Sequence, residues 1–231
     1  MAPPTATQSL TAPDADWRQS VEVDLPPILS AALDAFSEQG FHGTSVRDIA
    51  RRVGVTVPSL YYHHANKEAI LVDLLNQSLD HVGRVCSAAL AATGPAPHQR
   101  FFAMIEGLLR VVVHGGPLAM MHYELRALTE PERSVYAARR REFELQLTES
   151  IEQAAAAHIF DVTHPREASR AVLGMVQAIP VWYRPERGDM TPDEVADHYL
   201  DLIAHLVGAS PGVITAVRAG TLSRQGSTLT D

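Results

Sequence analysis

Cysteine is almost absent from this sequence, and so are long apolar runs. The single cysteine, Cys86, excludes a disulfide within the chain and is typical of a reducing cytoplasm. No apolar run approaches the roughly 18–20 residues that a membrane-spanning helix needs. The N-terminal residues also lack the basic start and apolar middle of a secretion signal. We therefore expect a cytoplasmic protein without a membrane span.

Positive charge is in deficit too, since the formal net charge is −8. This argues against a protein that coats nucleic acid through bulk charge, but it leaves room for a small, local nucleic-acid surface.

Motifs of catalysis and metal binding are also missing. The sequence has no G-x-S-x-G, no glycine-rich phosphate loop and no paired cysteine motif. The adjacent His63 and His64 diverge by about 100° on a helix. His198 and His205 lie about two turns apart, and neither pair belongs to a ligand pattern such as H-E-x-x-H. We predict no catalytic site, no metal and no cofactor.

Helical periodicity dominates what is present, and no alternating strand pattern occurs, so we predict an all-α fold. Residues 1–24 and 209–231 are rich in small and polar residues without periodicity and are predicted to be flexible tails. Residues 25–82 are expected to form a three-helix helix-turn-helix domain, followed by a fourth helix that extends to about residue 91. Residues 92–208 are expected to form a larger helical domain, with helices at about 98–114, 117–128, 131–158, 165–184 and 192–208.

Capping residues divide the N-terminal domain into short helices. Ser45 and Asp48 have the spacing of a capping box, in which each side chain bonds the backbone N–H of the other residue. Gly54 ends that helix. Thr56 and Asn66 are the expected N-caps of the next two helices.

The short helix after the glycine turn presents polar and aromatic side chains outward. If Leu60 faces inward, Val57 and His64 lie on the inner side, while Pro58 and Tyr62 point away. Two helices joined by a tight glycine turn form a helix-turn-helix. Hydroxyl groups bond phosphates and base edges, and aromatic or proline carbons contact thymine methyl groups. The alternative, in which the tyrosines only pack, does not account for the surrounding pattern.

The stretch "AALDAFSEQGFHGTSVRDIARRVGVTVPSLYYHHANKEAIL" resembles the N-terminal domain of the tetracycline-repressor (TetR) family of bacterial transcriptional regulators. The resemblance covers about residues 28–82. It depends on the coincidence of F-x-x-x-G-F, G-T-S-V-R-D-I-A, G-V-x-x-x-x-L-Y-Y-H and N-K-E-x-[IL]-L. It implies an all-helical homodimer, whose N-terminal domain binds operator DNA and whose C-terminal domain binds a small molecule and dimerises.

Site residues are carried over from the resemblance by position. It places these residues at the operator surface: Thr56, Val57, Pro58, Ser59, Tyr61 and Tyr62. Arg47 would reach a base or a phosphate, and Ser45, His63 and Lys67 would bind phosphate. His64 departs from the family, which usually has an apolar residue there. A neutral imidazole can fill that place if it finds a partner, and a tolerated substitution is a simpler account than a pH switch.

The effector site is expected near "VVVHGGPLAMMHYEL", because methionine and aromatic side chains suit an adaptable apolar pocket. The residues that we predict to bind the effector are Val113, His114, Met120, Met121, Tyr123, Glu124, Gln177 and Trp182; the plain alternative is that they form core. The sequence "WYRP" followed by "TP-x-E" is similar to a subset of the family that responds to acyl-coenzyme A thioesters. The basic run 139–141 could meet coenzyme A phosphates, although a solvated helix face is the simpler account.

These observations lead to one functional expectation. We expect a ligand-responsive, sequence-specific transcriptional regulator that represses by binding an inverted-repeat operator in double-stranded DNA. A largely apolar effector, such as an acyl-coenzyme A or another hydrophobic acid derivative, would release it. The homodimer would form through the last two long helices. The alternatives that stay open are a helical small-molecule-binding protein without specific DNA binding, and an enzyme.

Overall fold

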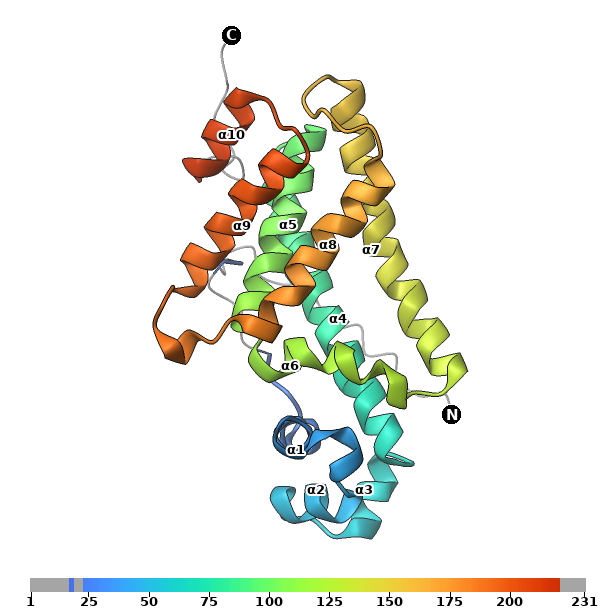
Figure 1. The fold of residues 1–231 in the computed structure, drawn as a ribbon. Coiled ribbons are helices and arrows are strands. Elements are labelled where there is room, and N and C mark those ends of the chain that lie inside the picture. Colours follow the sequence, from blue (N-terminus) through green and yellow to red (C-terminus); the bar gives the residue numbers. More distant parts are fainter. Residues whose placement is uncertain (1–16, 19–22, 221–231) are drawn as a thin grey trace.

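The computed structural model describes residues 17–18 and 23–220, and this part of the chain folds into helices without strands (Figure 1). The all-α prediction is therefore confirmed. The elements are α1 (Pro27–Gly43), α2 (Val46–Val53), α3 (Val57–His63), α4 (Lys67–Ala91), α5 (Pro97–His114), α6 (Gly116–Met120), the 3₁₀ helix η1 (Met121–Ala127), α7 (Glu130–Ala156), α8 (Pro165–Trp182), the 3₁₀ turn η2 (Pro185–Arg187), α9 (Pro192–Leu206) and α10 (Pro211–Arg218).

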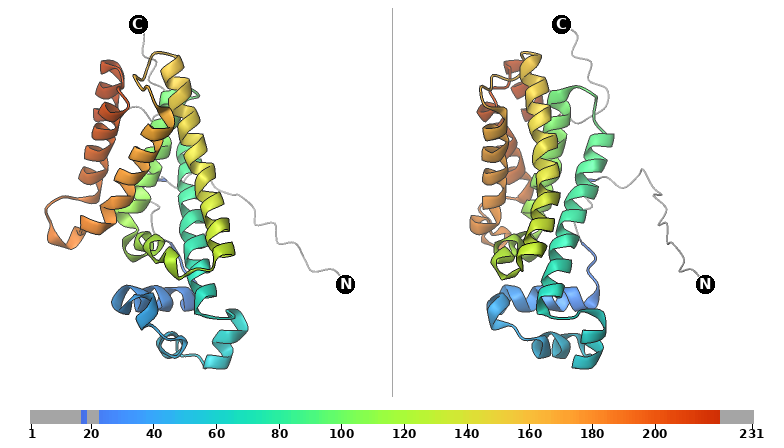
Figure 2. Two further views of the ribbon diagram at one scale, coloured as in Figure 1. Left: turned by 45° about the vertical axis from the view of Figure 1, so that its right-hand side comes forward. Right: turned by 90° about the vertical axis from the view of Figure 1, so that its right-hand side faces the viewer.

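Helices α1 to α3 form a small unit at one end of the molecule, which we call the head (Figure 1). The remaining helices form a larger bundle, with α5 packed against α4, α7, α8 and α9. Helix α4 begins in the head and continues along the bundle, so it belongs to both units (Figure 2).

The capping residues of the head behave as the sequence predicts. The Ser45 Oγ accepts a hydrogen bond from the Asp48 N–H at 3.2 Å, and the Asp48 carboxylate accepts one from the Ser45 N–H at 3.2 Å. Asn66 Oδ1 accepts from the Ala69 N–H at 2.7 Å at the start of α4. Gly54 has φ of 80°, a left-handed conformation that favours glycine and reverses the chain between α2 and α3.

Two apolar clusters hold the molecule together. The head cluster includes Phe36, Ile49, Leu60 and Ile70, and it also receives Leu118, Met121, Leu128 and Tyr136 from the bundle side. The bundle cluster is built around the fully buried Phe101, Ile105 and Leu109 of α5. The head is therefore packed against α6, η1 and the start of α7, as well as being joined through α4.

Three details of the fold differ from the sequence expectations. The helix expected at 117–128 is divided into α6 and η1, and the chain bends by 112° after α5. Gly116 has φ of 46° at this bend, a backbone conformation that a helix cannot continue through.

Within the C-terminal segment predicted as a tail, residues 211–218 form α10, which packs on α9 through the buried Val213. Within the predicted N-terminal tail, Trp17 is buried against α4 and α5. Residues 1–16, 19–22 and 221–231 lie outside the described part.

No single helix among the described residues is both long and apolar enough to cross a membrane; by length and composition, only the bent pair of α5 and residues 116–127 passes. Helix α5 is largely buried in the bundle core.

Helices α4 and α5 approach closely at Gly107. A Cβ atom at this position would lie 3.2 Å from the Cys86 Sγ and 3.3 Å from the Cys86 Cα. The backbone of α4 cannot retreat from that contact without disturbing the core.

We expect Gly107→Ala to be less stable than Gly83→Ala by about 1–3 kcal/mol, because both gain helix propensity but only the first overpacks the core. Gly83 is the matched control, since it lies on α4 with nothing within 4 Å of an added Cβ. Urea unfolding at one protein concentration measures the difference. Equal free energies of unfolding would contradict the close α4–α5 contact.

Candidate functional site

The outward surface of α3 is the first candidate site. Leu60 is fully buried in the head cluster, and on the opposite side Tyr62 is 86% exposed and Tyr61 50% exposed. The orientation that the helical periodicity predicts for α3 is therefore confirmed. Figure 1 shows α2 and α3 at the end of the molecule away from the bundle.

Most of the predicted DNA contacts lie on this free surface. The exposed members are Ser45, Arg47, Thr56, Pro58, Ser59, Tyr61, Tyr62 and His63, whereas Val57 and Lys67 are half-buried. Thr56 also caps α3, since its Oγ1 accepts from the Ser59 N–H at 3.3 Å. Within the described residues, Arg47 has no carboxylate partner, while Arg51 and Arg52 pair with Asp48 and Glu38. The assignment of these residues to DNA stays a prediction.

Lys67 has a structural role in the head. Its Nζ donates hydrogen bonds to the carbonyl oxygens of Phe41 at 2.6 Å and Thr44 at 2.8 Å. The ammonium also lies 4.2 Å from the centroid of the Phe41 ring. Lys67 thereby ties the start of α4 to the turn between α1 and α2. An ammonium group has three N–H bonds, so one remains for a phosphate oxygen.

His64, which departs from the family pattern, has found a polar partner. Its Nε2 lies 3.0 Å from the Asp73 carboxylate of α4, and its side chain is 12% exposed. The buried Nδ1 has no hydrogen-bond partner in the described chain. This assigns the proton to Nε2, which can donate to Asp73, in place of the apolar contact of the family.

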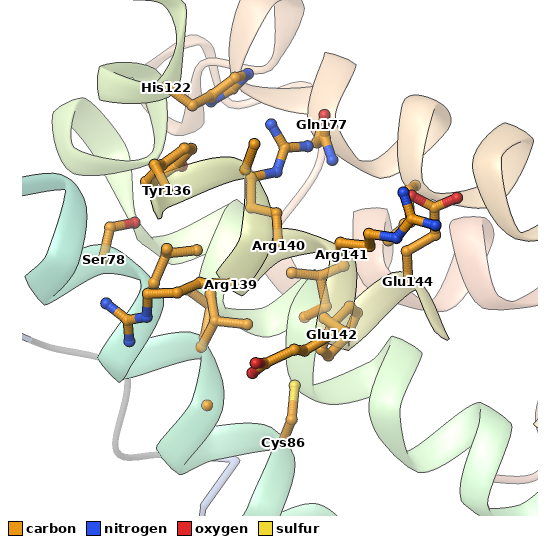
Figure 3. Close-up of a pocket in the computed structure, with 18 of the residues that line it drawn as sticks. Ser78, Cys86, His122, Tyr136, Arg139, Arg140, Arg141, Glu142, Glu144 and Gln177 are labelled. Atoms are coloured by element: carbon orange, nitrogen blue, oxygen red, sulfur yellow. The ribbon is translucent and has the colours of Figure 1, made fainter. Parts of the chain in front are cut away.

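The second candidate site is a cavity of about 930 Å³ among α4, α5, α7 and α8 (Figure 3). Its apolar lining comes from all four helices and includes Leu79, Val82, Leu90, Met104, Leu108, Phe143 and Leu173. This volume and composition suit an organic ligand of the size of a drug molecule. The sequence analysis did not find this lining, since the residues are apolar at ordinary helix spacing.

One wall of the cavity, on α7, carries charges of both signs, since Glu142 and Glu144 line it beside three arginines. The run 139–141, for which a solvated helix face was the simpler account, lines the cavity from α7. Arg139 is already engaged, with Asn76 Oδ1 at 2.8 Å and with the Asp80 carboxylate. Arg140 is half-buried and makes no ion pair within the described residues, and its guanidinium points toward Gln177 in Figure 3. Arg140 can therefore receive an anionic group of a ligand.

His122 contributes a neutral acceptor to the same cavity. Its Nδ1–H donates to the Ala119 carbonyl at 2.8 Å, which leaves Nε2 as an acceptor. Burial lowers the pKa of the imidazole and outweighs the opposing hydrogen bond to Ala119, while the nearby Arg140 lowers the pKa further. The ring is therefore uncharged at neutral pH.

Only Gln177 of the predicted effector residues lines this cavity. Because the chain bends after α5, Met120 and Met121 pack against the head cluster instead. The other predicted residues are placed as follows: Val113 is in the bundle core, His114 is exposed, Tyr123 donates from its hydroxyl to the Gln177 carbonyl at 3.1 Å, Glu124 is half-buried, and Trp182 is 43% exposed and stacked on Tyr199.

Helices α8 and α9 carry exposed apolar side chains. Val181 and Leu202 are each 53% exposed, and Leu206 is 38% exposed. Exposed apolar side chains mark a protein–protein contact where they form one contiguous patch. Within residues 17–18 and 23–220, no cluster of three His, Cys, Asp or Glu side chains is placed to hold a metal ion.

Comparison with protein families matches two parts of the chain. Residues 28–74 match the family described as "Bacterial regulatory proteins, tetR family", and residues 94–207 match "Tetracyclin repressor-like, C-terminal domain". The first match covers most of the head and the start of α4, and the second covers most of the bundle.

Individual proteins are similar over different lengths. RutR of Escherichia coli strain K12, an HTH-type transcriptional regulator, is 45% identical over 62 residues, which are 27% of this chain and 29% of RutR. The HTH-type transcriptional repressor KstR2 of Rhodococcus jostii is 26% identical over 84% of this chain and 96% of its own length. The structure of AibR in complex with isovaleryl coenzyme A and operator DNA has a TM-score of 0.68 and 25% identity, over 79% of this chain and 97% of AibR.

Cys86 offers a test of whether water reaches the wall of the cavity. The thiol is 4% exposed, and burial raises its pKa to about 12. Since the thiolate is the reactive form, we expect iodoacetamide at pH 8 to label the native protein roughly 1,000-fold more slowly than the urea-unfolded chain. Equal labelling rates for the two states would show that the thiol is solvated.

Proposed function

Because the chain belongs to the TetR family of bacterial transcriptional regulators, we propose that it represses transcription as a homodimer bound to an inverted-repeat operator, and that a small amphipathic effector releases it. Residues 25–82 would bind DNA, and residues 92–208 would bind the effector and dimerise. The observation that carries the proposal is that α4 connects the head, with its exposed α3 surface, to a large cavity.

Helix α4 is suited to transmit a signal. Lys67 in its first turn is hydrogen-bonded to the head, and Val82 and Cys86 in its second half line the cavity. A ligand that fills the cavity would displace α4 as a rigid lever, and the head would move with it. A shift of a few Å changes the spacing of the two heads of a dimer, whereas successive major grooves are about 34–36 Å apart. The DNA surface itself would stay uncovered.

The cavity favours an amphipathic anion as effector. Its apolar lining can hold a hydrocarbon group, while Arg140 lacks an ion pair among the described residues and Gln177 offers an amide. Acyl-coenzyme A thioesters have this combination, and isovaleryl coenzyme A is the molecule in the AibR complex. We propose an acyl-coenzyme A or a similar hydrophobic acid derivative for this chain.

The dimer would bury the exposed apolar side chains of α8 and α9, including Val181, Leu202 and Leu206.

Selection of bound sequences from random DNA, followed by footprinting and sedimentation, tests the proposed function. We expect a protected inverted repeat and a dimer at micromolar concentration. A monomer that enriches no sequence would contradict the proposal and would favour a small-molecule-binding protein without an operator.

Substitutions on the head separate sequence reading from phosphate binding. Tyr62→Ala should reduce the preference for the operator over random DNA without unfolding the head, because the side chain is 86% exposed. Lys67→Ala should weaken binding to all sequences and lower the salt slope by about one phosphate contact. Anisotropy titrations at several salt concentrations measure both effects. If Lys67→Ala changed base preference while Tyr62→Ala had no effect, α3 would not face the DNA as proposed.

Arg140 should contribute to effector affinity. We expect Arg140→Gln to weaken the binding of acyl-coenzyme A thioesters, tested from isovaleryl coenzyme A upward in chain length, roughly 10- to 100-fold. Arg100→Gln is the matched control, because Arg100 is exposed on α5 and does not line the cavity. Calorimetry gives the affinities. If no thioester binds the wild type, or if both variants bind equally, the proposed effector class is wrong.

A further inference from the structure

An aromatic side chain that precedes the head is buried in the bundle. Trp17 is 7% exposed and packs against Val85 and Ala89 of α4 and Ala103 and Val111 of α5. It therefore fills the groove between the two helices. A tryptophan with so little exposure makes a large apolar contact, and its loss is costly.

Arg18, next to Trp17, forms an ion pair with Glu106 of α5. Its Nε donates to Glu106 Oε1 at 2.7 Å and its Nη2 to Oε2 at 3.3 Å, so both carboxylate oxygens are engaged. The guanidinium also lies 4.2 Å from the centroid of the Trp17 ring. Glu106 is 8% exposed, and charge-assisted, two-point contacts of this kind are among the stronger hydrogen bonds in proteins.

The contact extends from Glu106 to another part of the bundle. Glu106 also accepts from Arg110 Nε at 3.3 Å, and Arg110 Nη1 donates to Asp193 Oδ1 at 2.7 Å at the start of α9. We call Trp17 and Arg18, together with these contacts, the N-terminal anchor. It is fixed to α4, α5 and α9, not to the head.

The chain that follows the anchor reaches the head within a short distance. Val23 and Leu25 pack against the head cluster. Arg18 and Val23 are separated by five peptide steps, which span at most about 18 Å. The bundle and the head are therefore joined covalently at two places, by α4 and by residues 19–22, which lie outside the described part. The second connection limits how far the start of the head can move from the anchor.

The anchor also lies next to the cavity. Val82 and Leu90 of α4 and Val111 of α5 are in contact with the Trp17 cluster, and the same three residues line the cavity. The anchor therefore packs on the same part of α4 that an effector in the cavity would contact.

We propose that Trp17 and Arg18 are positioning residues for operator binding, which hold the second half of α4 against α5 and keep the head in the position that the operator requires. Neither residue touches DNA or effector in this scheme. The inference relies on the proposed function for its DNA readout, and it concerns residues that no part of that function assigns.

The experiment compares full-length Trp17→Ala, Trp17→Phe and Arg18→Gln with the wild type. Leu145→Ala is the matched control, because Leu145 is 54% exposed on α7 and does not line the cavity. Hydrogen exchange without DNA or effector is the first readout. We expect amides of residues 82–91 to exchange about tenfold faster in Trp17→Ala, to recover in Trp17→Phe, and to stay unchanged in the control.

Operator affinity is the second readout, measured by anisotropy with the selected operator and with random DNA of equal length. Trp17→Ala should bind the operator about tenfold more weakly, with unchanged affinity for random DNA, and Trp17→Phe should recover. Faster exchange in α4 without a change in operator affinity would overturn the positioning role. Unchanged exchange would overturn the anchor itself.

Two further outcomes are also decisive. If Trp17→Ala does not fold, Arg18→Gln takes its place, with the same directions expected and the same overturning results. If the wild type selects no operator, the proposed function fails, and the exchange measurement alone still decides whether the anchor holds α4.

Discussion

Helix α4 contributes buried side chains to both the head cluster and the bundle cluster, and the arrangement of the other elements depends on this. Ile70, Leu71 and Leu74 belong to the head cluster, while Cys86 belongs to the bundle cluster and packs against Gly107 of α5. A continuous helix without a proline curves only gently between these points. The head therefore follows α4, and the position of α4 is set by what packs on its two sides in the bundle.

Two different features adjoin the second half of α4. One is a cavity with an apolar lining and an arginine that makes no ion pair within the described residues, and the other is the buried Trp17. A ligand can change the position of α4 only if it binds the displaced state more tightly than the observed one. Couplings of this kind are about 1–3 kcal/mol, which is comparable to the loss of one well-packed contact. Filling the cavity and loosening the anchor would thus act on the same equilibrium.

Sequence reasoning succeeded where the determining interactions are local. Ser45, Thr56 and Asn66 cap helices through residues three positions away, and the inward Leu60 fixes which side of α3 is free. It did not reach the contacts that join distant segments. The cavity depends on how four helices cross, and Met121 is turned toward the head by the bend after α5. Trp17 and α10 have too little periodicity around them to reveal their partners. Arg140 lies in a run that looks like a solvated helix face until α4 and α8 are placed opposite it.

The central claim is that the cavity and the α3 surface are coupled through α4. Thermodynamic reciprocity then requires operator DNA to weaken effector binding by the same factor by which the effector weakens operator binding. Calorimetric titration of the proposed acyl-coenzyme A effector, with and without saturating operator, measures that factor directly. The account predicts an affinity roughly 5- to 150-fold lower in the presence of operator. Equal affinities in the two titrations would contradict it.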